Sequence, residues 1–304
     1  MDIRNGFLET IGNTPLIRLA RASEETGCEI LGKAEFLNPG SSVKDRAALY
    51  IVRDAEERGV LEPGGVIVEG TAGNTGIGLA LVGNAKGYRT VIVIPETQSQ
   101  EKKDMLRLCG AEVREVPAVP YKDPNNYVKL SGRLAEELAK SEPHGAIWAN
   151  QFDNTANRHG HYLTTGPEIW RDTNGEITHF VSAMGTTGTI MGTSRFLKER
   201  NPEIRIVGVQ PAEGAKIPGI RRWPEAYLPR IFDPARVDME MDVTQEAAET
   251  TARRLAAEEG IFCGISSGGA VAAALRLAGG RREALIVTII CDRGDRYLST
   301  GIFS

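Results

Sequence analysis

The chain has 304 residues, and at roughly 100–200 residues per domain this length suggests two domains. Hydrophobic residues make up 41% and charged residues 25% of the chain, which excludes a disordered, collagen-like or coiled-coil protein. A net charge of −4 and only 6% aromatic residues argue against a nucleic-acid-binding protein, which usually carries a basic excess and stacking aromatic side chains.

Cysteine, histidine and apolar patterns exclude several further classes. The four cysteines form no C-x-x-C pair and the four histidines show no ligand spacing, so we expect no metal. Scattered cysteines in a chain of this length favour reduced thiols. The first residues lack the apolar run of a signal peptide, and no stretch reaches about 18 apolar residues. We therefore expect no membrane span and a cytoplasmic location.

Short β-branched runs alternate with helical patterns along the chain. The predicted strands are Glu29–Ala34, Val66–Val68, Thr90–Ile94, Glu112–Val116, Ala146–Trp148, His179–Ser182, Arg205–Val209 and Ala284–Ile290. The predicted helices are Val43–Arg58, Ile77–Lys86, Gln100–Cys109, Tyr127–Lys140, Thr189–Glu199, Gln245–Glu259 and Gly268–Leu277. The strands are apolar throughout, as expected for strands covered on both faces.

This alternation predicts an α/β protein with mostly parallel sheets. Two strand–helix series are separated near residues 143–157. We expect two doubly wound α/β domains, a smaller one over residues 41–146 and a larger one from residues 1–40 and 147–304. Ligands of such sheets bind beyond the carboxyl ends of the strands.

Three glycine-rich loops follow apolar segments and open helices. They span residues 70–76, 185–189 and 264–269. Glycine lets the backbone approach an anion closely, and the amides at a helix start, with threonine hydroxyls, donate to it. One such loop is often no more than a helix start, but three in one chain favour a site for an anionic small molecule.

Lys44 is the candidate reactive group. Ser42 and Asp45 fit a helix-capping pattern, S-x-x-D, which places Lys44 in the first turn of a helix. The positive end of the helix dipole disfavours an ammonium there, so Lys44 is a candidate nucleophile or base. The plain alternative is a solvated lysine at a helix start.

Other enzyme motifs leave two rival interpretations. The chain contains neither G-x-S-x-G nor G-x-x-x-x-G-K-[ST], which removes the α/β-hydrolase and P-loop classes. Residues 73–78 with Glu96 partly imitate a dinucleotide fingerprint, although the glycine spacing is G-x-x-G-x-G. A nicotinamide-dependent oxidoreductase is therefore an alternative, and a non-catalytic anion-binding protein is a weaker one.

Five ordered motifs carry a family resemblance that covers essentially the whole chain. They are residues 11–16 (IGNTPL), 39–46 (PGSSVKDR), 73–76 (GNTG), 185–189 (GTTGT) and 266–268 (SSG). Together they resemble the pyridoxal-phosphate β-family, and within it the cysteine synthases, or O-acetylserine sulfhydrylases. The resemblance implies a fold-type II (tryptophan synthase β-like) enzyme and a homodimer. Its larger domain would anchor pyridoxal 5'-phosphate and its smaller, mobile domain would bind substrate.

The two halves of the chain resemble different subgroups. Residues 1–158 are similar to one bacterial cysteine synthase subgroup. From Tyr162 onward, residues 185–189, 217–223 and 291–297 look like cysteine synthase B. A natural mosaic, a recombinant chimera or an intermediate lineage would each explain this.

The resemblance implies a role for each matching residue. Lys44 would hold pyridoxal phosphate and act as the catalytic base, and Asn74 and Ser266 would contact the cofactor ring. Its phosphate would lie on Gly185, Thr186, Thr187, Gly188 and Thr189. The substrate carboxylate would lie on Thr71, Ala72, Gly73, Thr75 and Gln151, although many family members carry serine where this chain has Ala72. Arg221, beside Arg222, is either a solvated residue or part of a second anion site.

The implied reaction is a β-replacement that makes L-cysteine, or S-sulfocysteine, from O-acetyl-L-serine and sulfide or thiosulfate through an aminoacrylate intermediate. An O-phosphoserine-using sulfhydrylase is the alternative within the family. A complex with serine acetyltransferase is possible but not favoured, because cysteine synthase B-like proteins are generally poor partners.

Overall fold

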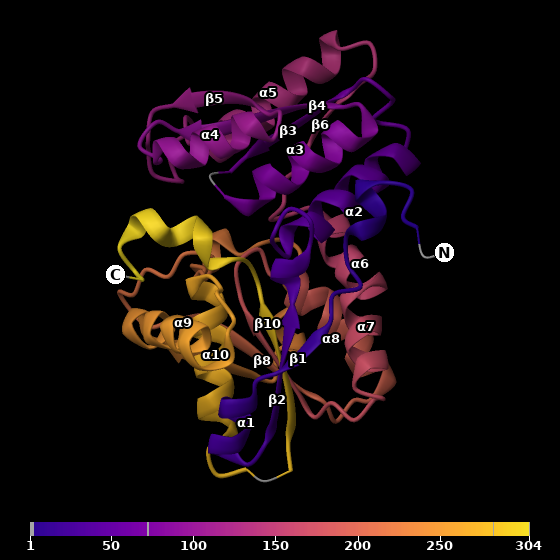
Figure 1. Cartoon of the computed structure of the whole chain (residues 1–304). Coiled ribbons are helices and arrows are strands. Elements are labelled where there is room, and N and C mark those ends of the chain that lie inside the picture. The colour runs from indigo at the N-terminus through magenta and orange to yellow at the C-terminus, as the bar shows by residue number, and fades with distance from the viewer. Residues whose placement is uncertain (1–2, 72, 282, 304) are drawn as a thin grey trace. The chain divides into compact units, whose positions relative to one another are not determined.

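The computed structural model describes residues 3–71, 73–281 and 283–303 (Figure 1). The chain divides into two compact units. The smaller unit comprises residues 1–11 and 44–157, and the larger comprises residues 12–43 and 158–304. The chain therefore passes from one unit to the other at residues 11–12, 43–44 and 157–158.

The smaller unit is built on a four-stranded parallel sheet with the order β5-β4-β3-β6. Its strands are β3 (Val66–Gly70), β4 (Arg89–Pro95), β5 (Glu112–Val116) and β6 (Ala146–Trp148). Its longer helices are α2 (Lys44–Glu57), α3 (Asn74–Lys86), α4 (Gln100–Leu108) and α5 (Tyr127–Ser141). Val66 and Val68 pack with α5, whereas Ile67 between them packs with α2 and α3. This alternation shows that both faces of the sheet are covered.

The larger unit holds a six-stranded sheet with the order β1-β2-β10-β7-β8-β9, in which only the β1–β2 pair is antiparallel. Its strands are β1 (Leu16–Arg18), β2 (Glu29–Ala34), β7 (His179–Ala183), β8 (Arg205–Pro211), β9 (Met239–Val243) and β10 (Leu285–Ile290). Its helices are α1 (Ala20–Thr26), α7 (Thr165–Asp172), α8 (Gly188–Arg200), α9 (Gln245–Glu259) and α10 (Ile265–Ala278). A further helix, α6 (Thr155–Leu163), spans the boundary between the units.

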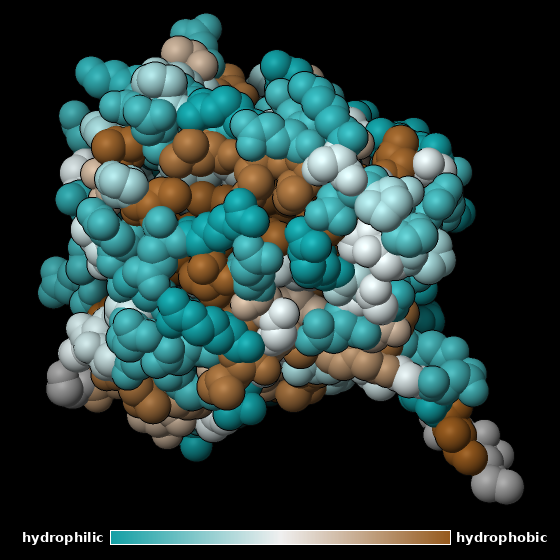
Figure 2. Space-filling model, turned by 90° about the horizontal axis from the view of Figure 1, so that it is seen from above, coloured by the Kyte–Doolittle hydropathy of each residue, from teal (hydrophilic) through white to brown (hydrophobic). Residues whose placement is uncertain are grey.

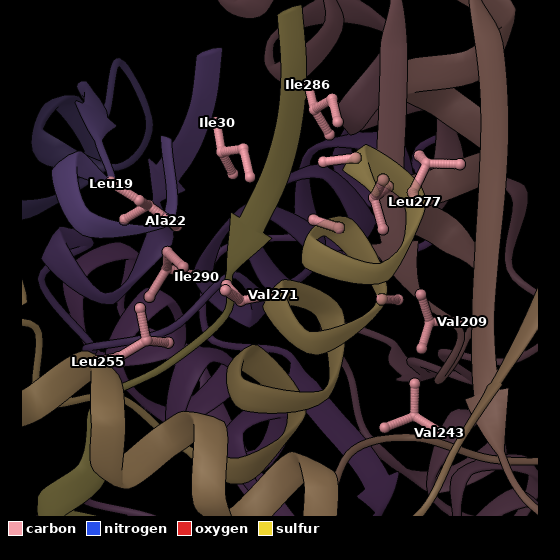
Figure 3. Packing of buried hydrophobic residues seen from close by; sticks show 14 of the residues in the cluster. Leu19, Ala22, Ile30, Val209, Val243, Leu255, Val271, Leu277, Ile286 and Ile290 are labelled. Carbon is pink, nitrogen blue, oxygen red and sulfur yellow. The ribbon is translucent and has the colours of Figure 1, made fainter. Parts of the chain in front are cut away.

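Two apolar clusters cover the two faces of this sheet. Val209 and Ile286 lie with Val271 of α10 and Leu255 of α9 in one cluster (Figure 3). Phe180, Ile206 and Val287 lie with residues of α7 and α8 in the other. The sheet is thus a buried parallel sheet between helical layers, and the fold is the α/β arrangement that the strand–helix alternation predicts.

The structure corrects the sequence-based elements at the sheet edges. Strand β5 is an edge strand with mostly exposed residues, so the expectation that all strands are covered on both faces is wrong there. Five elements lie where no helix or strand is predicted, namely β1, β9, α1, α6 and α7. Strand β9 carries the polar sequence M-E-M-D-V on an edge, and it therefore lacks the apolar run on which the prediction relied.

The bounds of the smaller unit differ from those of the predicted smaller domain. Residues 7–11 pack in the apolar cluster of the smaller unit. Strand β6 pairs with β3 in that unit's sheet, and the loop after β6 belongs to the same unit. The smaller unit therefore includes residues 1–11 and 147–157, which we assigned to the larger domain. The roles given to the two domains stay predictions.

On the face shown in Figure 2, hydrophobic residues lie in groups between hydrophilic side chains. The large exposed ones include Leu108, Leu163 and Leu298. Among the residues that the structure describes, no helix has the length and apolar character needed to cross a membrane.

Candidate active site

Lys44 is the first residue of α2, as the capping pattern predicts. The backbone before it is tightly fixed: Ser41 has a left-handed φ of 62°, and the Val43 N–H donates to the Cys291 carbonyl over 2.9 Å. Gly78 of α3 approaches the Lys44 carbonyl so closely that a Cβ on Gly78 would lie 3.1 Å from it. The start of α2 is therefore held against α3 within the smaller unit.

The loop of residues 70–76 joins β3 to α3 and carries several predicted residues. A Cβ at Gly70 would meet Ser131, Val128 and Tyr127 at 2.7–2.8 Å, so only glycine fits there. Asn74 is the first residue of α3, whose first-turn N–H groups lack helical partners and favour an anion. Thr71 is buried, and its hydroxyl accepts from the Gly73 N–H over 3.3 Å. Ala72 lies outside the described residues.

Gln151, far away in sequence, meets this loop through hydrogen bonds. The Thr75 hydroxyl donates to Gln151 Oε1 over 2.6 Å, and both residues are buried. The Asn150 N–H donates to Glu69 Oε2 over 2.8 Å, and the Gln151 backbone and side chain also bond to Glu69. Burial raises the pKa of Glu69 to about 8, although these hydrogen bonds lower it.

The sequence analysis did not single out Glu69. A single carboxyl in the otherwise apolar run V-I-V-E-G, directly before the glycine loop, is the signal that could have found it. The structure places it with Thr75 and Gln151, two residues that the family resemblance selects. The smaller unit therefore brings the predicted residues Thr75 and Gln151 together with Glu69.

The loop of residues 185–189 joins β7 to α8 in the larger unit. Thr187 has a left-handed φ of 69° and is the N-cap of α8. Its side chain is buried, and its Oγ1 has no hydrogen-bond partner in the part of the chain that the structure describes. The Thr186 hydroxyl accepts from the Gly188 N–H over 3.4 Å. The loop therefore combines helix N–H groups with a buried hydroxyl that still lacks a partner.

His161, which the sequence analysis left unassigned, lies behind this loop. Its Nε2 is 3.2 Å from the Thr189 hydroxyl and its Nδ1 is 2.8 Å from the Thr165 hydroxyl. The imidazole therefore fixes the side chain of Thr189.

Ser266 and Arg221 also belong to the larger unit. Ser266 lies buried in the first turn of α10. Gly219, with a φ of 86°, approaches it so closely that a Cβ would lie 3.1 Å from the Ser266 Cβ. The Arg221 guanidinium lies 5.3 Å from the centre of the Trp223 ring, and Trp223 Nε1 donates to the Gly185 carbonyl over 2.8 Å. Arg221 is thereby connected to the 185–189 loop.

The fold is that of an α/β protein, and the helix starts that follow these two loops favour an anionic group. Family comparison makes this specific: the model described as "Pyridoxal-phosphate dependent enzyme" matches residues 7–292. The chain belongs to this family, and its fold is that of the fold-type II pyridoxal-phosphate enzymes.

Individual relatives match over nearly the full chain. The chain is 52% identical to cysteine synthase B of Salmonella typhimurium, covering 98% of this chain and 96% of the relative. It is 48% identical to cysteine synthase 1 of Neurospora crassa, covering 97% of this chain and 82% of the relative. The crystal structure of O-ureido-L-serine synthase superposes with a TM-score of 0.91 at 39% identity, covering 99% of this chain and 95% of that one.

The comparisons decide between the interpretations left open by the sequence. The resemblance to the pyridoxal-phosphate β-family and its cysteine synthases is confirmed, and the nicotinamide-dependent alternative is not favoured. The 185–189 loop also fits the family's cofactor on structural grounds. A phosphate is an acceptor, and the unpartnered Thr187 hydroxyl with the N-terminal N–H groups of α8 supplies donors for it.

Proposed function

We propose that this chain is a pyridoxal-phosphate-dependent cysteine synthase that replaces the β-substituent of O-acetyl-L-serine with sulfur. The observation that carries the proposal is the 185–189 loop, with its buried, unpartnered Thr187 hydroxyl at the start of α8. It occurs in a chain that is 52% identical over 299 residues to a cysteine synthase B.

The residues of the family motifs are assigned to the cofactor. Lys44 would hold it covalently, and Gly185, Thr186, Thr187, Gly188 and Thr189 would bind its phosphate. Asn74 would contact the ring hydroxyl, and Ser266 would contact the ring nitrogen. Since serine is neutral, it does not keep that nitrogen protonated as a carboxylate would. When bound, pyridoxal phosphate withdraws electrons from the α-carbon of an attached amino acid, which allows the β-substituent to leave.

The protein's own residues bind the amino acid and move its proton. Thr71, Ala72, Gly73, Thr75 and Gln151 are assigned to the substrate carboxylate, which the first-turn N–H groups of α3 also favour. The free amine of Lys44 Nζ would remove the α-proton and return it after sulfur has added. Closure of the smaller domain on carboxylate binding would exclude water during these steps.

Lys44 is tested by Lys44→Ala, with Lys86→Ala as the matched control because Lys86 is half-buried in the same unit and pairs with Glu56 at 2.8 Å. Loss of a catalytic base typically costs about 10²–10⁴-fold in rate. Lys44→Ala should lose turnover and borohydride-trapped cofactor, whereas Lys86→Ala should keep both. Trapping of pyridoxal phosphate at one site in Lys44→Ala would refute the assignment.

The reaction itself is tested by steady-state assays that cross O-acetylserine and O-phosphoserine with sulfide and thiosulfate. We expect turnover with O-acetylserine, giving cysteine from sulfide and S-sulfocysteine from thiosulfate. Turnover with O-phosphoserine alone would identify the alternative sulfhydrylase. No turnover with any pair would refute the proposed function.

Arg221 is proposed to bind an anionic donor or leaving group, because its guanidinium is exposed and lies on the Trp223 ring beside the 185–189 loop. Arg222, which pairs with Asp242 at 2.6 Å, is the control for removing a neighbouring guanidinium. Arg221→Ala should lower the rate with thiosulfate more than the rate with sulfide, whereas Arg222→Ala should change neither selectively. An equal fall with both donors would refute this role.

The assembly and location follow from the family resemblance. We infer a homodimer in the cytoplasm that acts on small molecules. Size-exclusion chromatography with light scattering tests the dimer, and co-purification with a serine acetyltransferase tests the less favoured complex.

A further inference from the structure

Glu69 is a buried carboxyl that the proposed reaction does not use. It lies at the carboxyl end of β3, is 1% exposed, and directly precedes the loop assigned to the substrate carboxylate. Burying such a group is unfavourable unless its hydrogen bonds are satisfied, so its partners indicate what it does.

Within the described part of the chain, Glu69 accepts its hydrogen bonds from the turn after β6. The Asn150 N–H donates to Oε2 over 2.8 Å, and the backbone and side-chain amides of Gln151 donate to the same carboxyl. Asn150 has a left-handed φ of 45°, a conformation that is uncommon outside glycine and that asparagine tolerates better than most residues. The carboxyl thus fixes both the backbone and the side chain of this turn.

The orientation of the Gln151 amide follows from this contact. Because Glu69 receives the NH₂ end of the amide, Oε1 is left facing Thr75, whose hydroxyl donates to it over 2.6 Å. The single hydroxyl proton of Thr75 is therefore used on Gln151. The second N–H of Gln151 and the first-turn N–H groups of α3 remain as donors for an incoming carboxylate.

We propose that Glu69 is a positioning residue that fixes the direction of the Gln151 side-chain amide, and through it the Thr75 hydroxyl, so that the loop presents donors to the substrate carboxylate. This inference rests on the proposed function, because Gln151 and Thr75 are taken as substrate-binding residues there. Glu69 itself touches neither the substrate nor the cofactor in this proposal.

A double-mutant cycle tests whether Glu69 acts through Gln151. The holoenzymes of the wild type, Glu69→Ala, Gln151→Ala and the double variant are titrated with L-serine, which carries the same carboxylate and amine but a poor leaving group. Binding is followed by calorimetry and by the visible absorbance of the bound cofactor. A misdirected hydrogen bond to a charged group should raise the dissociation constant about tenfold or more in each single variant.

The double variant separates positioning from general support of the fold. If Glu69 acts through Gln151, the double variant binds L-serine as Gln151→Ala does, within about twofold. The proposal is overturned if the fold-change of the double variant is the product of the two single fold-changes. It is also overturned if Glu69→Ala changes the dissociation constant for L-serine less than twofold. Glu56→Ala is the control for removing a carboxyl from this unit, since Glu56 bonds Lys86 and Tyr88, and it should bind L-serine as the wild type does.

Glu69→Gln keeps the side-chain volume and serves if Glu69→Ala does not fold. Above the pKa of about 8 the wild-type carboxylate accepts on both oxygens, whereas the amide of Glu69→Gln offers one acceptor and one donor and permits the Gln151 amide to reverse. L-serine binding measured at pH 9 should therefore weaken again in Glu69→Gln. Unchanged binding in Glu69→Gln overturns the proposal. A wild type that neither binds L-serine nor makes cysteine refutes the proposed function itself, and this result is seen before any variant is made.

Discussion

The buried Glu69 should make the stability of the protein depend on pH in a way that Glu69→Gln removes. Burial raises the pKa of this carboxyl from its ordinary value of 4.5 to about 8, against the hydrogen bonds from Asn150 and Gln151 that lower it. Between these two values the folded protein keeps a proton that the unfolded chain releases. The contribution of this proton to the unfolding free energy is therefore complete below about pH 4.5 and is lost as the pH rises through about 8.

The magnitude follows from the size of the shift. Each pKa unit corresponds to about 1.4 kcal/mol of unfolding free energy. The rise in the pKa of Glu69 from 4.5 to about 8 therefore corresponds to roughly 5 kcal/mol. Glutamine does not titrate, and all other ionisable groups are shared by the two proteins. The unfolding free energy of Glu69→Gln minus that of the wild type should therefore rise by about 1.4 kcal/mol per pH unit over this interval. Any constant cost of the substitution cancels in this slope.

The assay is urea unfolding of both apoproteins, followed by circular dichroism at pH 5, 6, 7 and 8 under matched salt. Removal of the cofactor keeps its own titration out of the comparison. A difference between the two proteins that stays constant within about 1 kcal/mol across this range would refute the reasoning, since a shift of one pKa unit already exceeds that amount. Glu69 would then be ionised in the folded protein.

Three further predictions concern other polar groups. Thr187→Ala removes the unpartnered hydroxyl of the 185–189 loop and should weaken pyridoxal phosphate binding about tenfold or more. Titration of the apoprotein with pyridoxal phosphate measures this. Binding equal to that of the Thr187→Ser control would contradict the prediction. Lys33 is fully buried and pairs with Glu168 at 2.7 Å, so Lys33→Met should lower the unfolding free energy by about 3–5 kcal/mol. The double variant with Glu168→Gln should regain part of this free energy. If the losses of the two single variants simply add in the double variant, the pair does not contribute. The Glu259 carboxylate accepts from the N–H groups of Ala20, Arg21 and Ala22 at the start of α1, so Glu259→Ala should cost about 1–2 kcal/mol in the same denaturation assay, and no loss would show that α1 does not need this cap.

Sequence reasoning located elements that have strong local signals. The apolar runs at Glu29–Ala34 and Ala146–Trp148 and the helix at Gln245–Glu259 have the predicted bounds. Each carries its own signal, either a continuous apolar run or a helix with its cap, as Thr244 accepts from the Ala247 N–H before α9. The polar edge strand β9 has no such signal, because its pairing with β8 is what defines it.

The candidate site divides in the same way. Lys44 and the glycine loops are local patterns, and the structure places them at helix starts as predicted. Gln151 required the family resemblance, since 76 residues separate it from Thr75. Glu69 required the structure, because its role depends on a turn that lies about 80 residues further along the chain.

The order in which the two units draw on the chain has a consequence for how the protein is made. The smaller unit has all its residues once synthesis reaches Asn157. Strand β2 of the larger unit pairs with β10, whose residues 285–290 are synthesised long after those of β2. Because domains generally fold as units during synthesis, the smaller unit should fold first. Until β10 is made, the β10-facing edge of β2 has no strand to pair with, and such an open edge is a site for mispairing in the nascent chain.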